Sequence, residues 1–250
     1  PSGHGAPAAV GEAMALKRAG VGNVRVFVLD GEGGLTPGGV SEALNSAYGL
    51  GLDNLYFVVD WNDYGIDSHS VSSVVFGTPN DWFGSHGWRV YGTEKGSDWR
   101  SVAEVILKAV NAENLDHKPN AIWVKTRKGR GYLKYDYASH GAPHKTNSEL
   151  FWETKREFAE KYNVQFVNFG GPAPADEEAY QSEYKANLKV VIDVLQQDQD
   201  LVDFLANRLV SLGDSISQEH PNFNLGIKGN PFKDQRLYDF KNYPQDLFAK

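Results

Sequence analysis

The feature that most constrains the fold is an apolar run that ends in a glycine-rich, acidic turn, "VRVFVLDGEGGLTPGG" over residues 24–39. Its first part, Val24–Leu29, is short and Val-rich, which predicts a strand buried on both faces, as in a parallel sheet. Two carboxylates, Asp30 and Glu32, then stand among five glycines. Ligands of open α/β sheets bind beyond the carboxyl ends of the strands. This turn is therefore the first candidate site.

The remaining chain alternates helical and strand patterns. Helices are expected over 6–19, 40–50 and 99–110, and strands over 24–29, 54–59, 88–91 and 121–125. This alternation implies right-handed crossovers and an α/β fold, a parallel sheet with helices on both faces. Later helices are expected over 148–162, 177–195 and 198–212, and from Gly213 to Lys250 periodicity is lost, which predicts an extended tail. We expect an α/β domain over 1–165 and a helical extension with an extended tail over 166–250.

Composition excludes several classes of function. The 250-residue chain has a net charge of −7, which argues against a nucleic-acid partner, because phosphate backbones select basic surfaces. It has no cysteine, so disulfides, thiolate metal sites and cysteine nucleophiles are excluded, and a cytoplasmic location is compatible. No apolar run is long enough to span a membrane. The chain has no initiator Met and enters directly into a loop and a helix, which is typical of a chain that begins inside a domain.

Three interpretations of the turn compete. Gly31 and Gly33 match the first two glycines of a dinucleotide-binding motif, and Asp60 stands where a ribose-binding acid belongs. However, the third glycine is Thr36, and the carboxylate of Glu32 would repel a pyrophosphate. A P-loop is excluded because no Gly-Lys-Ser/Thr follows. A tight acidic turn without any ligand is the simplest alternative.

The third interpretation adds a divalent cation between a diphosphate and the carboxylate. Mg²⁺ prefers oxygen ligands, usually one or two from the protein and the rest from phosphate and water. Glu32 can supply one oxygen, and Asn62, at the end of the next strand, can supply another. Gly31 and Gly33 allow the backbone to approach, and the helix that begins near Val40 adds its dipole. The pairing of the turn with Asn62 favours a phosphate site over an empty turn.

The segment "GEGGLTPGGVSEALNSAYGLGLDNLYFVVDWND" resembles the thiamine diphosphate motif of transketolases, which begins Gly-Asp-Gly and ends about thirty residues later at Asn. Here Glu32 and Asn62 are 30 positions apart (62 − 32). The segments "PSGHGAPAAVGEAMALKRAG", "GWRVYG", "IWVKTRKGRGY" and "SHGAP" resemble further family motifs in the correct order. The resemblance covers about residues 1–165.

The resemblance implies thiamine diphosphate and Mg²⁺ as cofactors and assigns roles to individual residues. The implied metal ligands are Glu32, Asn62 and the backbone carbonyl of Tyr64. The implied cofactor-binding residues are Gly3, His4, Gly31, Gly33, Asn62, Ile66 and His140. His140 would also reach the substrate, and Glu42 would join a proton relay between two active sites, so both count as catalytic. Taken without the resemblance, His140, next to Gly141 and Pro143, is more typical of a loop-capping histidine than of a catalytic one.

The chain also departs from the family pattern. Glu32 replaces the metal-binding Asp, so that either Glu32 or Asp30 could contact the metal, and Pro37 replaces an expected acid. The pyrimidine-binding domain, with the glutamate that activates the cofactor, is absent from this sequence.

The implied activity is transfer of a two-carbon ketol unit between sugar phosphates. It would require a pyrimidine-binding domain or chain, in a homodimer or a heterotetramer. Alternatives are another thiamine diphosphate enzyme (a 2-oxo acid dehydrogenase first component or 1-deoxyxylulose-5-phosphate synthase), an NAD-binding oxidoreductase domain, or a non-catalytic scaffold subunit.

Overall fold

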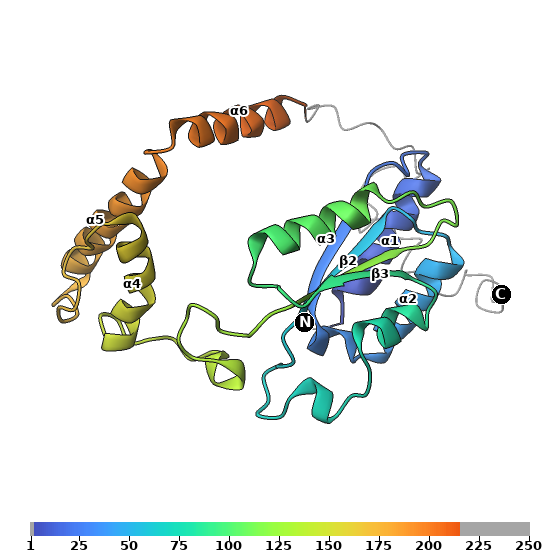
Figure 1. Ribbon diagram of the computed structural model, residues 1–250, viewed down its shortest axis with the longest axis horizontal. Coiled ribbons are helices and arrows are strands. Elements are labelled where there is room, and N and C mark those ends of the chain that lie inside the picture. The colour runs from blue at the N-terminus through green and yellow to red at the C-terminus, as the bar shows by residue number, and fades with distance from the viewer. Residues whose placement is uncertain (1–2, 216–250) are drawn as a thin grey trace, which may run out of the picture. The chain divides into compact units, whose positions relative to one another are not determined.

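The computed structural model describes residues 3–215 (Figure 1). The chain divides into two units, residues 1–202 and 203–250, and each is considered by itself. The first unit contains a four-stranded parallel sheet in the order β1-β2-β4-β3. Its strands are β1 (Val26–Gly31), β2 (Leu55–Trp61), β3 (Arg89–Thr93) and β4 (Asn120–Lys125).

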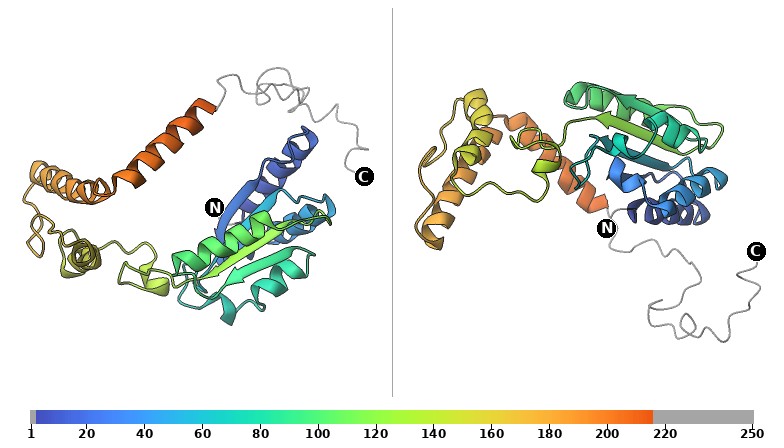
Figure 2. Two further views of the ribbon diagram at one scale, coloured as in Figure 1. Left: turned by 45° about the horizontal axis from the view of Figure 1, so that its top comes forward. Right: turned by 90° about the horizontal axis from the view of Figure 1, so that it is seen from below.

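Helices cover both faces of this sheet, as the sequence predicts. They are α1 (Gly5–Arg18), α2 (Gly38–Gly49) and α3 (Trp99–Asn111). Helices α1 and α2 pack on one face and α3 on the other (Figure 2). The chain passes from β1 to β2 through α2, but it returns from β3 to β4 through α3. Because parallel crossovers are right-handed, reversing the direction of travel places α3 on the opposite face.

The main core lies between the sheet and helices α1 and α2. The side chains of Phe57, Phe83 and Trp88 are buried together, with ring centroids 5.4–6.4 Å apart. The Trp88 indole N–H donates to the backbone carbonyl of Leu44 at 3.0 Å, which satisfies its one polar atom. A smaller cluster around Ile122 fills the space beneath α3.

The prediction that the first strand is buried on both faces is wrong. The residues of β1 alternate between buried and exposed, with Phe27 51% exposed and Leu29 75% exposed, so the strand is not buried on both faces. β1 is an edge strand of the described sheet, and α3 packs over β3 and β4 instead. The ring of Phe27 stacks on that of Tyr56 in the neighbouring strand, with centroids 5.0 Å apart.

The predicted helical extension is also present. It comprises α4 (Glu149–Tyr162), α5 (Glu177–Leu195) and α6 (Gln199–Ser215). Ser148 and Asp176 cap α4 and α5 by accepting hydrogen bonds from backbone amides. The predicted tail lies outside the described residues from 216 onward, and the boundary at 165/166 stays a prediction. Within residues 3–215, no helix combines the length and the apolar character that crossing a bilayer requires.

A charge cluster ties α1 to the loop before β2. Asp53 accepts hydrogen bonds from Lys17 Nζ at 2.7 Å and from His117 Nδ1 at 2.5 Å. Burial raises the pKa of Asp53, but the hydrogen bonds from His117 and Lys17 outweigh it and hold this pKa below its ordinary value. A carboxyl group whose pKa is lower in the folded state stabilises the fold at pH values above its unfolded-state pKa, near 3.9. This stabilisation is lost as the pH falls through the folded-state pKa.

Asp53→Asn is therefore expected to lower the free energy of unfolding by about 1 kcal/mol at pH 7, because the pair is only partly buried. The deficit should shrink below about pH 4, where the wild-type carboxylate becomes protonated. Urea unfolding at several pH values measures both effects. Asp116→Asn is the matched control, because Asp116 pairs with Lys118 at a more exposed position. An equal loss in both variants would contradict the special role of Asp53.

Candidate functional site

The ends of three strands lie level at one edge of the sheet. The β1–β2 register pairs Gly31 with Asp60, and the β2–β4 register pairs Trp61 with Lys125. In a parallel sheet these are all carboxyl ends. The turns that follow β1, β2 and β4 therefore meet at this edge, where α/β folds bind their ligands.

Glu32 is the central residue of this edge. It begins a 3₁₀ turn (Glu32–Leu35) directly after β1, and its side chain is only 1% exposed. Its carboxylate accepts hydrogen bonds from the backbone amides of Asn62, at 3.0 Å, and Asp63. Asp63 has a φ of 70°, in the left-handed region that Asp tolerates. Its amide and that of Asn62 both donate to the carboxylate of Glu32.

Burial raises the pKa of the Glu32 carboxyl, and the nearby charge of Asp60 adds to this effect. Hydrogen bonds from the backbone amides of Glu32 and Asn62 act in the opposite direction but do not cancel it. Among residues 3–215, no Lys, Arg or His forms an ion pair with Glu32. The more distant charge of Lys125 also lowers this pKa, so the site contains a buried acid that a described cation influences but does not pair with.

The turn after β2 is held by its own polar side chains. Asn62 Nδ2 donates to Asp60 Oδ2 at 3.0 Å, and Asn62 Oδ1 accepts from the Tyr64 amide at 2.9 Å. The other Asp60 oxygen accepts from the Thr126 hydroxyl, which comes from the turn after β4. Asp60, which the dinucleotide interpretation assigned to a ribose, instead links two turns of the candidate site.

Two glycines of the turn, Gly31 and Gly33, lie where a Cβ would make only ordinary van der Waals contacts. A Cβ built on Gly33 would lie 3.9 Å from the Cα of Gly65. Gly33 therefore faces the turn after β2 and does not press against it. Gly3 has a φ of 83°, and a Cβ there would lie 2.6 Å from Pro37. Only glycine therefore lets the loop before α1 lie so close to Pro37.

The two carboxylates of the turn point to different neighbours. Asp30 accepts from the Gly31 amide at 2.9 Å, and its carboxylate lies so close to Gly34 that a Cβ there would clash with it. Glu32, by contrast, is bonded to the segment that contains Asn62. Of the two carboxylates, Glu32 is therefore the one that contacts the turn after β2.

Lys128 is a site residue that the sequence patterns did not reveal. Its Nζ donates to the carbonyl of Gly65 and lies 3.5 Å from Nδ1 of His140. It thereby connects the loop of His140 to the turn after β2. One signal could have indicated it, because Lys128 follows the fourth predicted strand, at the same edge as Glu32 and Asn62. The basic run "KTRKGRG" by itself indicates only a loop that is solvated or binds a small phosphate.

The other predicted residues are less constrained. Ile66 is 67% exposed, and His4, the residue before α1, is also exposed. Glu42 lies exposed on α2, where it has no hydrogen bond or ion pair with any described residue. Nothing in this arrangement tests the proton-relay role of Glu42, which stays a prediction.

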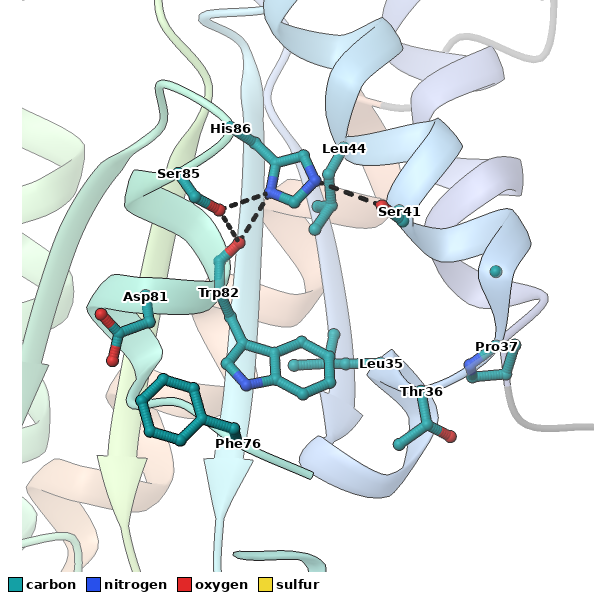
Figure 3. Close-up of a pocket in the computed structure, with 11 residues that line it drawn as sticks. Leu35, Thr36, Pro37, Ser41, Leu44, Phe76, Asp81, Trp82, Ser85 and His86 are labelled. Carbon is teal, nitrogen blue, oxygen red and sulfur yellow. Dashed lines mark hydrogen bonds between the residues drawn. The ribbon is translucent and has the colours of Figure 1, made fainter. Parts of the chain in front are cut away.

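A cavity of about 330 Å³ lies beside the first turn of α2, and it contains none of the predicted site residues. Figure 3 shows the ring of His86 between the carbonyl of Trp82 and the hydroxyl of Ser41. His86 Nδ1 lies 2.8 Å from the carbonyl oxygen and Nε2 lies 3.3 Å from the hydroxyl. A carbonyl can only accept, so Nδ1 carries the hydrogen. These contacts tie α2 to the short helix Asn80–Gly84.

The donor set at the sheet edge fits Mg²⁺. Residues 3–215 contain no cluster of three or more His, Cys, Asp or Glu side chains able to hold a metal. Mg²⁺ does not require one, because it takes one or two protein carboxylates and completes its shell with phosphate and water. Glu32, the amide oxygen of Asn62 and the carbonyl of Tyr64 supply oxygen atoms only. A cation would also neutralise the buried charge of Glu32.

Comparison with known sequences identifies the family. The family described as "Transketolase, thiamine diphosphate binding domain" matches residues 4–186. Transketolase-like protein 2 of Bos taurus is 34% identical over 143 residues, which are 56% of this chain and 22% of the relative. An apulose-4-phosphate transketolase subunit of Actinobacillus succinogenes is 32% identical over 133 residues, which are 52% of this chain and 45% of the relative. The chain thus spans less than half the length of these two relatives.

Comparison with known structures agrees on the fold. The transketolase from Leishmania mexicana superposes with a TM-score of 0.55 at 22% identity, over 83% of this chain and 31% of that chain. At this identity the likeness concerns the fold alone. The family match, however, spans more than half of the sequence. The chain therefore belongs to the transketolase family and contains its thiamine diphosphate binding domain.

Proposed function

We propose that this chain supplies the diphosphate- and Mg²⁺-binding half of a transketolase-type site, which transfers a two-carbon ketol unit from a ketose phosphate to an aldose phosphate. The observation that carries the proposal is the buried carboxylate of Glu32, which forms no ion pair among the described residues and is bonded to the segment that contains Asn62. Family membership supports thiamine diphosphate as the cofactor.

In this proposal the chain's own residues bind and orient. Glu32, Asn62 and the Tyr64 carbonyl hold the cation, while Gly31 and Gly33 let the backbone approach the diphosphate. The bound cofactor supplies the carbanion chemistry, as cofactors generally do. Gly3, His4 and Ile66 complete the walls of the cofactor site.

His140 is assigned to the diphosphate and to the polar groups of the substrate. Lys128 lies close enough to hold the His140 ring and adds a positive charge that suits a phosphate-bearing ligand. Glu42 is assigned to a relay that needs a second chain. The substrates are sugar phosphates, in line with the name of the relative from Actinobacillus succinogenes.

A second polypeptide is part of the proposal. The same relative is named as one subunit of its enzyme, which supports an arrangement in which a separate chain provides the pyrimidine-binding domain. The assembly would be a heterotetramer, or a homodimer if that domain belongs to the same chain. A cytoplasmic location stays a prediction, based on the absence of cysteine.

The direct test is calorimetric titration of thiamine diphosphate into the chain and its pyrimidine-binding partner, with Mg²⁺ and then with EDTA. Binding is expected only with Mg²⁺. Asn62→Ala should weaken it by at least about tenfold, because even outer-shell partners of metals contribute 10–100-fold. Asn111→Ala, at the exposed end of α3, is the control and should bind normally. Metal-independent binding, or none with the partner present, would contradict the proposal.

Substrate choice separates the alternatives. With partner and cofactor supplied, a ketose phosphate should be consumed only when an aldose phosphate acceptor is added. Consumption of pyruvate instead would indicate a 2-oxo acid dehydrogenase component or a 1-deoxyxylulose-5-phosphate synthase. Cofactor binding without turnover of either substrate would indicate a non-catalytic scaffold.

A further inference from the structure

Helices α4 and α5, with the loop between them, enclose a second cavity of about 450 Å³. This volume falls within the range of small-molecule sites. Most of its lining is apolar or aromatic, including Phe151, Phe158, Tyr180 and Tyr184. All lining residues belong to the segment 147–191, so none of the predicted cofactor-binding residues takes part.

The cavity also contains one cation, Lys155, without an ionic partner among the described residues. Its Nζ lies 3.5 Å from the centre of the Phe151 ring and donates to the Phe151 carbonyl at 3.2 Å. It contacts the Thr154 hydroxyl at 3.4 Å. No described carboxylate lies within ion-pair distance, and burial lowers the pKa of this ammonium. The ammonium is thus held by a carbonyl, a hydroxyl and an aromatic face, none of which carries a negative charge.

The acid that lines the same cavity, Glu183, is already bound. Its two oxygens accept from Asn147 Nδ2 at 2.8 Å and from Asn168 Nδ2 at 2.7 Å. It forms no ion pair with Lys155 within the described residues. Lys155 is the positively charged side chain of this lining, and the carboxylate of the lining is already hydrogen-bonded to two amides.

We propose that this cavity binds a small amphipathic monoanion, with an aromatic or branched aliphatic body among the rings and a carboxylate on Lys155. A carboxylate suits the site because it would supply the missing counter-charge and accept a charge-assisted hydrogen bond from the ammonium. The cavity's aromatic walls would bury the body of the ligand. The proposal is independent of the function proposed for the sheet edge.

The test uses 3-phenylpropionate and its neutral amide, titrated into the full chain by calorimetry. The carboxylate is expected to bind at least tenfold more tightly than the amide. Lys155→Met, which keeps the length of the side chain, should remove this preference and leave the affinity for the amide unchanged. Lys161→Met is the matched control, since Lys161 lies exposed on the same helix and should change neither affinity.

A second measurement needs no variant. Lysines are labelled biosynthetically with ¹³C at Cε, which leaves the ammonium and its three N–H donors intact, and titrated by NMR with and without 3-phenylpropionate. The ligand should raise the pKa of Lys155 toward its ordinary value and leave that of Lys161 unchanged. Equal affinity for carboxylate and amide, an unmoved Lys155 signal, or no binding of either probe would overturn the proposal.

Discussion

Glu32→Gln is expected to abolish Mg²⁺-dependent binding of thiamine diphosphate, with a loss of a hundredfold or more. The glutamine side chain has nearly the same shape, but it carries no charge to attract the cation. It also presents an NH₂ group to two backbone amides, of Asn62 and Asp63, which are themselves donors. One amide of the pair would then lose its acceptor. Calorimetry with the pyrimidine-binding partner present measures the affinity directly.

The same substitution should change how stability depends on pH. The folded-state pKa of Glu32 is raised, so the ionised form is disfavoured in the fold. Without metal, the wild-type protein should lose stability as pH rises from the ordinary value of 4.5 through the higher folded-state value. Glu32→Gln cannot ionise and should lack this loss. Mg²⁺ should restore stability only to the wild type and only at the higher pH values.

Glu32→Asp is the control for charge. It keeps the carboxylate but shortens it by one methylene, so we expect binding weaker than wild type and clearly stronger than Glu32→Gln. If Glu32→Gln binds cofactor as tightly as wild type, Glu32 is not the metal ligand. Asp30→Asn would then be the next variant to examine.

Phe57→Ala is expected to lower the free energy of unfolding by about 3–5 kcal/mol, the usual cost of removing a buried aromatic ring. Phe57 is 1% exposed, and its ring contacts those of Phe83 and Trp88 at the centre of the larger core. Removal of the Phe57 ring would leave a new cavity between β2 and the segment before β3. Urea unfolding followed by tryptophan fluorescence reports the change, since Trp88 belongs to the cluster.

Phe27→Ala is the matched control on the neighbouring strand. Phe27 is 51% exposed and contacts one ring, that of Tyr56, so its removal should cost about 1 kcal/mol or less. Similar losses in the two variants would mean that the uncovered face of β1 is as important to stability as the buried core around Phe57 on β2.

Much of the fold follows from the sequence because its patterns are local. The periodicity predicts a helix over 177–195, and α5 is found at Glu177–Leu195, since Asp176 caps it and an apolar periodicity runs along it. The exposure of Phe27 and Leu29 cannot be predicted in the same way. It depends on the order of the strands, which places β1 at an edge, and not on the apolar run itself.

The site is only partly predictable for a similar reason. The proximity of Glu32 and Asn62 follows from the rule that parallel strands end at the same edge, and the structure brings these residues together. Their roles as metal ligands stay a prediction. Lys128 could not be predicted as a site residue, because its role depends on side-chain contacts with Gly65 and His140. The spacing of residues in the sequence does not reveal these contacts.

The hydrogen bonds that Glu32 makes have a consequence for the rate and entropy of cofactor capture. Because the carboxylate already fixes the amides of Asn62 and Asp63, the turn after β2 has little conformational freedom left to lose when a ligand arrives. Binding at this half of the site should therefore resemble docking onto a rigid surface. Ordering of the chain, and any slow step it causes, is then expected at the exposed residues of the site, such as His4 and Ile66, and not in the turn after β2.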